Sequence, residues 1–138
     1  MNKNAQAGFT LMEILIAIAI VGLLTTVGLS LFNYLASSKK KVAVMSLKTL
    51  DGALLQYYTQ IGQFPEQLKD LVQKPSDEAA ARAWETPFVK GKQALIDPWN
   101  RKYEYKLTPG TEHPYDLYSY GPNGKGAPKT EWISVWDL

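Results

Sequence analysis

Few side chains in this sequence of 138 residues have the type and spacing that enzymatic chemistry requires. The one histidine, His113, stands in a Glu-His-Pro turn, where an imidazole is far more often solvated than catalytic. Ser119 lacks a partner set of histidine and acid, and residues 121–126 lack the lysine spacing of a phosphate-binding loop. The absence of cysteine excludes a disulfide framework, a thiolate metal site and a cysteine nucleophile. We therefore predict that the protein is not an enzyme.

The acid whose position calls for a chemical explanation is Glu13. Residues 14–32 carry no charge, and the apolar run, extended back to Phe9, is long enough to cross a hydrocarbon core of about 30 Å. A carboxylate placed centrally in a bilayer costs about 2.5–3.5 kcal/mol. In apolar surroundings it is tolerable when paired with an ammonium group. The alternative is that Glu13 only marks where the membrane segment begins.

Two further features bear on how the apolar run is used. A cleaved secretory signal is an alternative to a membrane helix, and Ala36-Ser37-Ser38 could loosely serve as its cleavage site. The length of the run argues against it, because signal peptides have apolar regions of roughly 7–15 residues. Lysines 39–41 follow the run and only Lys3 precedes it, so a positive-inside count alone would put the C-terminal part in the cytoplasm.

After residue 35 the apolar pattern becomes periodic. Hydrophobic residues recur at steps of three and four, as on one face of a helix. They are Leu47, Leu50, Leu54, Tyr58 and Ile61. The first proline is Pro65, and Gly62 fits a helix C-cap shortly before it. The pattern predicts one long helix over about residues 9–61, its second half facing a core.

The rest of the chain predicts short helical segments and then strands. Residues 67–72 have helical character, and 75–82 form a loop or a helical turn that would begin at Asp77-Glu78. Residues 102–106 alternate polar and aromatic residues as a half-buried strand does. Two more strands are predicted at 115–120 and 132–136. Because so small a sheet is marginal alone, the long helix must cover one face. We expect an α+β fold, a lollipop with a long N-terminal hydrophobic helix packed on a small three-stranded antiparallel sheet.

The N-terminal motif resembles the processing site of type IV prepilins and pseudopilins. Gly8 and Phe9 are followed by Glu13 and an apolar helix. The resemblance implies that a prepilin peptidase cuts between Gly8 and Phe9 and that the new Phe9 amine is N-methylated. Glu13 would then pair with the Phe9 amine of a neighbouring subunit and fix the register of assembly. It implies a leader at 1–8, a transmembrane and filament-core helix at 9–35, and a periplasmic domain at 36–138.

The C-terminal part is similar to the major pseudopilins of the type II secretion system. The residues that carry the similarity are Asp97-Pro98-Trp99, 103–105, Pro109-Gly110, 115–119, Gly121, Ile133 and Trp136. This implies a structural subunit of the pseudopilus, which polymerises in the periplasm to drive export of folded proteins across the outer membrane. Alternatives are a type IV or competence pilin subunit and a membrane-anchored periplasmic binding module.

The same resemblance implies the location and the partners. The protein would span the bacterial inner membrane once, with its C-terminal domain in the periplasm. Its partners would be further copies of itself, the prepilin peptidase, minor pseudopilins, an inner-membrane platform protein, an assembly ATPase and the outer-membrane secretin. The formal net charge of +2 is too small to indicate nucleic acid.

Major pseudopilins typically bind calcium in the loop between their last two strands. Calcium takes six to eight oxygen ligands, several of them carboxylates. Here the candidate ligands reduce to the carbonyls of Leu117 and Ser119, the amide of Asn123 and the carboxylate of Glu131, with two lysines in the same loop. On this charge count we expect no cofactor, with prolines and internal hydrogen bonds holding the loop.

Overall fold

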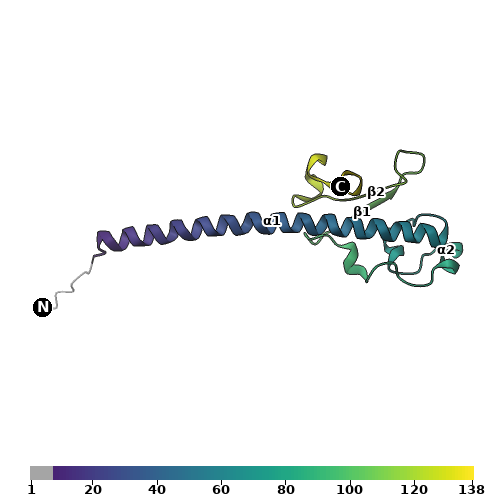
Figure 1. Cartoon of the computed structure of the whole chain (residues 1–138), viewed down its shortest axis with the longest axis horizontal. Coiled ribbons are helices and arrows are strands. Elements are labelled where there is room, and N and C mark those ends of the chain that lie inside the picture. The colour runs from purple at the N-terminus through teal and green to yellow at the C-terminus, as the bar shows by residue number, and fades with distance from the viewer. Residues whose placement is uncertain (1–7) are drawn as a thin grey trace. The chain divides into compact units, whose positions relative to one another are not determined.

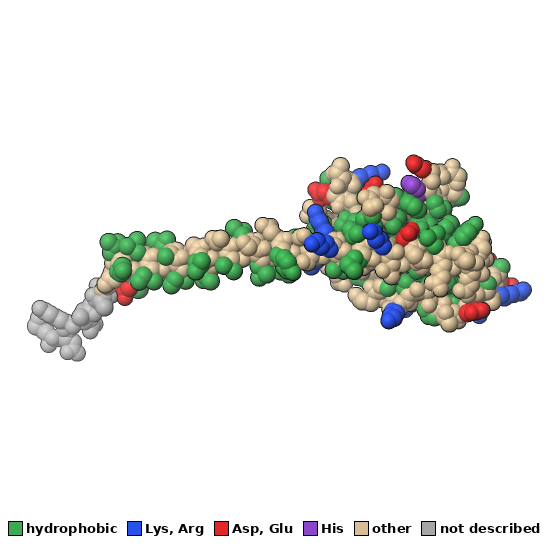
Figure 2. Space-filling model, in the orientation of Figure 1, with side chains coloured by type: hydrophobic (Ala, Val, Ile, Leu, Met, Phe, Trp, Pro, Cys, Tyr) green, Lys and Arg blue, Asp and Glu red, His purple; other side chains and the backbone are tan. Residues whose placement is uncertain are grey.

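The computed structural model describes residues 8–138, which form two compact units at 8–37 and 38–138. Its secondary structure begins with the long helix α1 (Leu11–Ile61). In the first unit the large hydrophobic side chains from Phe9 to Leu35 are exposed, and Figure 2 shows them along the visible face of this segment. The helix is long and apolar enough to cross a membrane. An apolar surface of this extent indicates that lipid or other helices cover it.

The second half of α1 supplies one wall of the core of unit 38–138. Its buried residues are Ala43, Leu47, Leu50, Ala53, Leu54 and Tyr57. The predicted face is therefore correct except at one position, because Tyr57 is buried and Tyr58 is exposed. The helix ends as predicted at Gly62, which has a φ of 89° and donates its N–H to the carbonyl of Tyr58 at 2.7 Å.

Short helices follow α1, and Figure 1 shows this part of the chain on one side of α1 and the strands on the other. They are the 3₁₀ helix η1 (Leu68–Leu71), the α-helix α2 (Glu78–Ala83) and the 3₁₀ helix η2 (Lys92–Leu95). Asp77 caps α2 by accepting the N–H of Ala80 at 2.8 Å. The helical segments predicted at 67–72 and 75–82 are thus present, the second beginning at Asp77 as expected.

Three antiparallel strands complete the fold in the order β1-β2-β3. They are β1 (Glu104–Leu107), β2 (Tyr115–Ser119) and β3 (Ile133–Ser134). β3 is shorter than predicted, because 3₁₀ helices lie on either side of it, η4 (Lys129–Glu131) before and η5 (Val135–Asp137) after. Another short 3₁₀ helix, η3 (Gly124–Gly126), precedes η4 in the loop that joins β2 to β3. The expected α+β fold of a long helix with a three-stranded antiparallel sheet is confirmed.

Tyr115 ties the sheet to α1. Its side chain is 1% exposed, and its hydroxyl donates to Asp51 Oδ1 at 2.5 Å. Burial raises the pKa of Tyr115, and the hydrogen bond to the Asp51 carboxylate raises it further. The hydroxyl therefore stays protonated and remains a donor to the half-buried acid.

Tyr115→Phe is expected to lower the free energy of unfolding of unit 38–138 by about 1.5 kcal/mol, because the Asp51 carboxylate loses its donor. Denaturant unfolding of the detergent-solubilised chain measures the change. The matched control is Tyr58→Phe, which removes the hydroxyl of an exposed tyrosine and should change stability by less than about 0.5 kcal/mol. Equal effects of the two substitutions would show that the bond to Asp51 is not stabilising.

Candidate functional site

The acid singled out by the sequence closes the first turn of α1. Glu13 Oε2 accepts the backbone N–H of Thr10 at 2.8 Å, and Thr10 Oγ1 accepts the N–H of Glu13 at 3.2 Å. This reciprocal pair is a capping box, which satisfies two of the N–H groups that every helix leaves unpaired at its start. Both residues are exposed. The Thr-x-x-Glu spacing was a signal for this contact, and our sequence analysis did not use it.

The capping contact uses one oxygen of the Glu13 carboxylate and leaves the other free to bind a cation. Glu13 Oε1 has no hydrogen-bond partner among residues 8–138. A free amine at Phe9 would therefore meet an acid that the helix start already holds in one orientation. Gly8 and Phe9 are also exposed, and a Cβ added at Gly8 would touch nothing within 4 Å. Residues 1–7, most of the predicted leader, lie outside the described residues.

A second polar centre surrounds the buried acid Asp97, which is 5% exposed. Its Oδ1 accepts the backbone N–H groups of Trp99 at 3.0 Å and of Arg101 at 2.9 Å. Its Oδ2 accepts the hydroxyl of Ser119 at 2.6 Å, and Ser119 Oγ in turn accepts the N–H of Gly121 at 3.1 Å. Asp97 therefore connects the 97–101 turn to the end of β2. The sequence marked Asp97 and Ser119 separately, and only the fold brings them together.

The loop after β2 is held from outside by Arg101. Its Nη1 donates to the carbonyl of Gly121 at 2.8 Å, and both terminal nitrogens lie 3.4–3.5 Å from the carbonyl of Pro122. A Cβ built on Gly124 would lie 3.0 Å from the guanidinium carbon, a tight contact, and the φ of 75° at this residue favours glycine. Gly121 has a φ of 74°, and a Cβ there would come within 2.8 Å of the Glu131 carbonyl. No feature of the sequence alone identified Arg101.

The side chains of the four residues considered for calcium do not supply the several carboxylates that a calcium site requires. The amide nitrogen of Asn123 donates to Glu131 Oε2 at 2.7 Å, so these two side chains are brought together but bind each other. The carbonyls of Leu117 and Ser119 belong to β2, where these residues pair with Tyr105 and Ile133, and the Ser119 hydroxyl is directed at Asp97. Within residues 8–138, no group of three or more acidic or histidine side chains could hold a metal. This donor set does not fit calcium, which needs several carboxylate oxygens.

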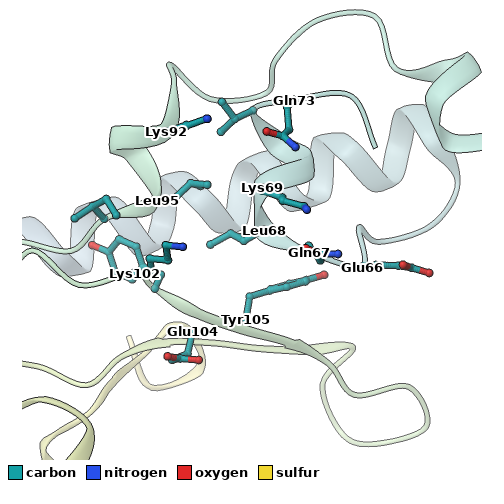
Figure 3. Close-up of a pocket in the computed structure, with 13 residues that line it drawn as sticks. Glu66, Gln67, Leu68, Lys69, Gln73, Lys92, Leu95, Lys102, Glu104 and Tyr105 are labelled. Atoms are coloured by element: carbon teal, nitrogen blue, oxygen red, sulfur yellow. The ribbon is translucent and has the colours of Figure 1, made fainter. Parts of the chain in front are cut away.

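Packing accounts for the aromatic side chains at one further groove and at the histidine. A groove of about 490 Å³ lies between η1, η2 and β1, lined by lysines and glutamates around Tyr105 (Figure 3). Tyr105 donates its hydroxyl to the Pro65 carbonyl at 2.7 Å, so this group is already bound. The ring of His113 stacks on Trp136 with centroids 4.1 Å apart. Packing explains both aromatic groups.

Comparison with known families identifies the chain. The family model described as "Type II secretion system (T2SS), protein G" matches residues 30–136, well over half of the sequence. The chain belongs to this family. A second model, the "Prokaryotic N-terminal methylation motif", matches residues 3–29, which include Gly8, Phe9 and Glu13.

Curated relatives support the same family over nearly the whole length. The chain is 33% identical to type II secretion system core protein G of Pseudomonas aeruginosa, over 99% of each protein. The corresponding protein of Xanthomonas campestris is 33% identical over 90% of this chain and 84% of its own length. That of Escherichia coli is 32% identical over 98% and 94%.

A solved structure shares the fold. The crystal structure of the major pseudopilin from the type 2 secretion system of enterohaemorrhagic Escherichia coli matches with a TM-score of 0.62 at 23% identity. The match covers 78% of this chain and 95% of that one. The predicted family, fold and role as a type II secretion pseudopilin are thereby confirmed, and the pilin and binding-module alternatives are not favoured. The family is one of structural subunits, and the matched motif and apolar helix fit a membrane-anchored member.

Proposed function

We propose that this protein is the processed, polymerising subunit of the pseudopilus, working in the periplasm to push folded proteins through the outer membrane, and that it acts without any catalytic activity. The observation that carries the proposal is an exposed apolar helix whose first turn presents an oriented carboxylate. A helix of this kind is stable in a membrane and also in a filament core, because both surround it with apolar groups.

The proposed assembly step depends on cleavage between Gly8 and Phe9. Cleavage creates an ammonium group at Phe9, four residues before Glu13. In a filament core each of these charges is costly alone and tolerable as a pair. Glu13 of one subunit would neutralise the Phe9 amine of its neighbour, and this contact would set the axial register. The apolar helices would then exchange lipid contacts for close helix packing.

The proposed partners follow from that sequence of steps. The prepilin peptidase removes residues 1–8, and the inner-membrane platform protein and assembly ATPase add the subunit to a filament of its own copies. Minor pseudopilins and the outer-membrane secretin complete the machine. We place residues 36–138 in the periplasm, against the positive-inside count of lysines 39–41, because the matched methylation motif is more specific than three lysines.

The mature N-terminus tests the proposal. Mass spectrometry of the protein purified from membranes is expected to show a chain that begins at Phe9 and carries one methyl group on its amine. The reason is that cleavage must free the amine before the charge pair can form. An intact Met1, or a cut near Ser37, would contradict the assembly mechanism.

Two glycine variants give this measurement its control. Gly8→Val is expected to keep the leader, because a branched side chain hinders close approach of the peptidase to the backbone. Gly22→Val introduces the same side chain inside α1, where a Cβ would touch nothing within 4 Å, and should leave processing unchanged. Leader removal from both variants would show that Gly8 does not define the cleavage site.

A further inference from the structure

In the loop between β2 and β3, where the family resemblance predicts calcium, the guanidinium of Arg101 contacts the backbone of this chain. We propose that the guanidinium of Arg101 is the resident cation of this loop and closes it without a divalent metal. The proposal concerns residues 97–131 and does not depend on how the pseudopilus is processed or assembled.

The first observation is the use of backbone oxygens. The carbonyls of Gly121 and Pro122 face the Arg101 guanidinium, at 2.8 Å for Gly121 and 3.4–3.5 Å for Pro122. Carbonyl oxygens in a tight loop are ligands that calcium also uses. Hydrogen bonds from a charged donor are about twice as strong as neutral ones, so the arginine satisfies the Gly121 carbonyl well, while its longer contacts to the Pro122 carbonyl are weaker. A metal ion that used these two carbonyls would have to displace the guanidinium.

The second observation is that Arg101 is fixed in place by its own backbone. Its N–H donates to Asp97 Oδ1 at 2.9 Å, and its carbonyl accepts the N–H of Asp97 at 2.7 Å. Asn100, the residue before it, adopts a left-handed conformation with a φ of 64°, which closes the 97–101 turn. The base of the side chain is therefore held opposite the loop by contacts that do not involve the loop itself.

The third observation is that the loop is shaped around the guanidinium. Gly124 lies against it, so that an added Cβ would come to 3.0 Å from the guanidinium carbon, and its φ of 75° is one that glycine adopts without strain. Because Arg101 as a whole is exposed, its charge keeps contact with water and avoids the desolvation cost of a buried cation.

The fourth observation is the charge of the loop itself. Residues 121–131 contain two lysines, Lys125 and Lys129, and one acid, Glu131. The Glu131 carboxylate already accepts a hydrogen bond from Asn123. Lys129 lies over the Trp132 ring, with Nζ 5.8 Å from its centroid. A divalent ion would meet a surplus of positive charge and no free pair of carboxylates. The arginine carries one charge and donates in fixed directions, which suits a site built of carbonyls.

The test compares metal dependence and local opening in the full-length protein in detergent micelles. For the wild-type chain, about 1 mM calcium chloride, or excess EDTA, is expected to shift Tm by less than about 1 °C, although extracellular calcium modules bind in or below this concentration range. A reproducible stabilisation by calcium, with slower hydrogen exchange in residues 121–131, would overturn the proposal. This arm needs no variant and therefore decides even if a variant fails to fold.

The variants test the role of the charge. Arg101→Gln keeps a polar side chain of similar width and removes the charge, and it is expected to raise amide exchange in residues 121–131 about tenfold and to lower Tm by about 3–6 °C. Arg101→Lys keeps the charge without the planar fork and should give an intermediate result. The matched control is Lys102→Gln, because Lys102 is also exposed and donates no hydrogen bond to the loop. Exchange in Arg101→Gln equal to that in Lys102→Gln would overturn the proposal.

Discussion

Replacing Glu13 with glutamine is expected to prevent assembly of pseudopili while membrane insertion and leader removal continue. Glutamine keeps an amide oxygen that can accept the Thr10 N–H, and it is as good a capping-box residue as glutamate. It carries no charge, however, so the Phe9 amine of the neighbouring subunit would enter an apolar core without a partner. An unpaired buried charge of this kind costs several kcal/mol, enough to reduce assembly by orders of magnitude. Electron microscopy of overproduced filaments and a secretion assay measure the outcome.

The converse variant separates the two roles of the same carboxylate. Thr10→Ala removes the hydroxyl that accepts the Glu13 N–H at 3.2 Å but leaves the charge. Loss of an N-cap side chain costs about 1 kcal/mol, so this variant should assemble at a reduced level. If Glu13→Gln assembled normally and Thr10→Ala did not, the acid would serve the helix start and the charge-pairing mechanism would be wrong.

Asp97→Ala is expected to destabilise unit 38–138 by about 3 kcal/mol, the largest stability effect that we predict for a single polar residue. The substitution leaves three donors without an acceptor: the N–H groups of Trp99 and Arg101 and the hydroxyl of Ser119. A hydrogen bond to a charged group contributes about 1.5–3 kcal/mol, and we take about 3 kcal/mol for the three together because bonds that share one acceptor do not add independently. For a domain of this size, Tm should fall by about 10–20 °C. Thermal unfolding of the detergent-solubilised chain measures the fall.

Two related variants make the Asp97 experiment specific. Asp97→Asn keeps an oxygen for the two backbone N–H groups and should lose less stability than alanine. Asp116→Ala removes an exposed carboxylate from the neighbouring strand β2 and should cost less than about 0.5 kcal/mol. If Asp97→Ala were no more harmful than Asp116→Ala, the buried acid would not be what connects the 97–101 turn to β2.

The two units of the molecule are stabilised in different ways. Residues 8–37 have an apolar surface that no other part of their own unit covers, so their stable state depends on a membrane or on neighbouring copies. Residues 38–138 bury their own core, and a few charged groups fix the loops around it. The variants at Glu13 should therefore affect assembly, and those at Asp97 and Arg101 should affect the stability of the domain.

Much of the fold could be predicted from the sequence because its determinants are local. The absence of proline before Pro65, the apolar periodicity and Gly62 define α1, and backbone hydrogen bonds within a helix join residues only four apart. Alternation of polar and aromatic residues at 102–106 located β1 to within two residues, because the strand begins at Glu104, and the strand predicted at 115–120 is present as β2. The N-terminal motif was also readable from the sequence, because its spacing within six residues carries the recognition signal. The limits predicted for the leader, the membrane helix and the domain stay predictions.

The tertiary structure alone decided the contacts that periodicity leaves open. Tyr57 and Tyr58 both lie at helical spacing from Leu54, and Tyr57 is the buried one because its ring packs against Phe88, with centroids 5.2 Å apart. Arg101 reaches a loop 20 residues away in sequence, and Asp97 meets Ser119 at a distance of 22 residues. Such contacts require that the helix and the sheet bring distant segments together, so neither residue type nor spacing in the sequence predicts them. The sequence by itself thus determined most of the elements and the processing motif, whereas the contacts of Asp97 and Arg101 with the end of β2 and the loop after it depended on the packing.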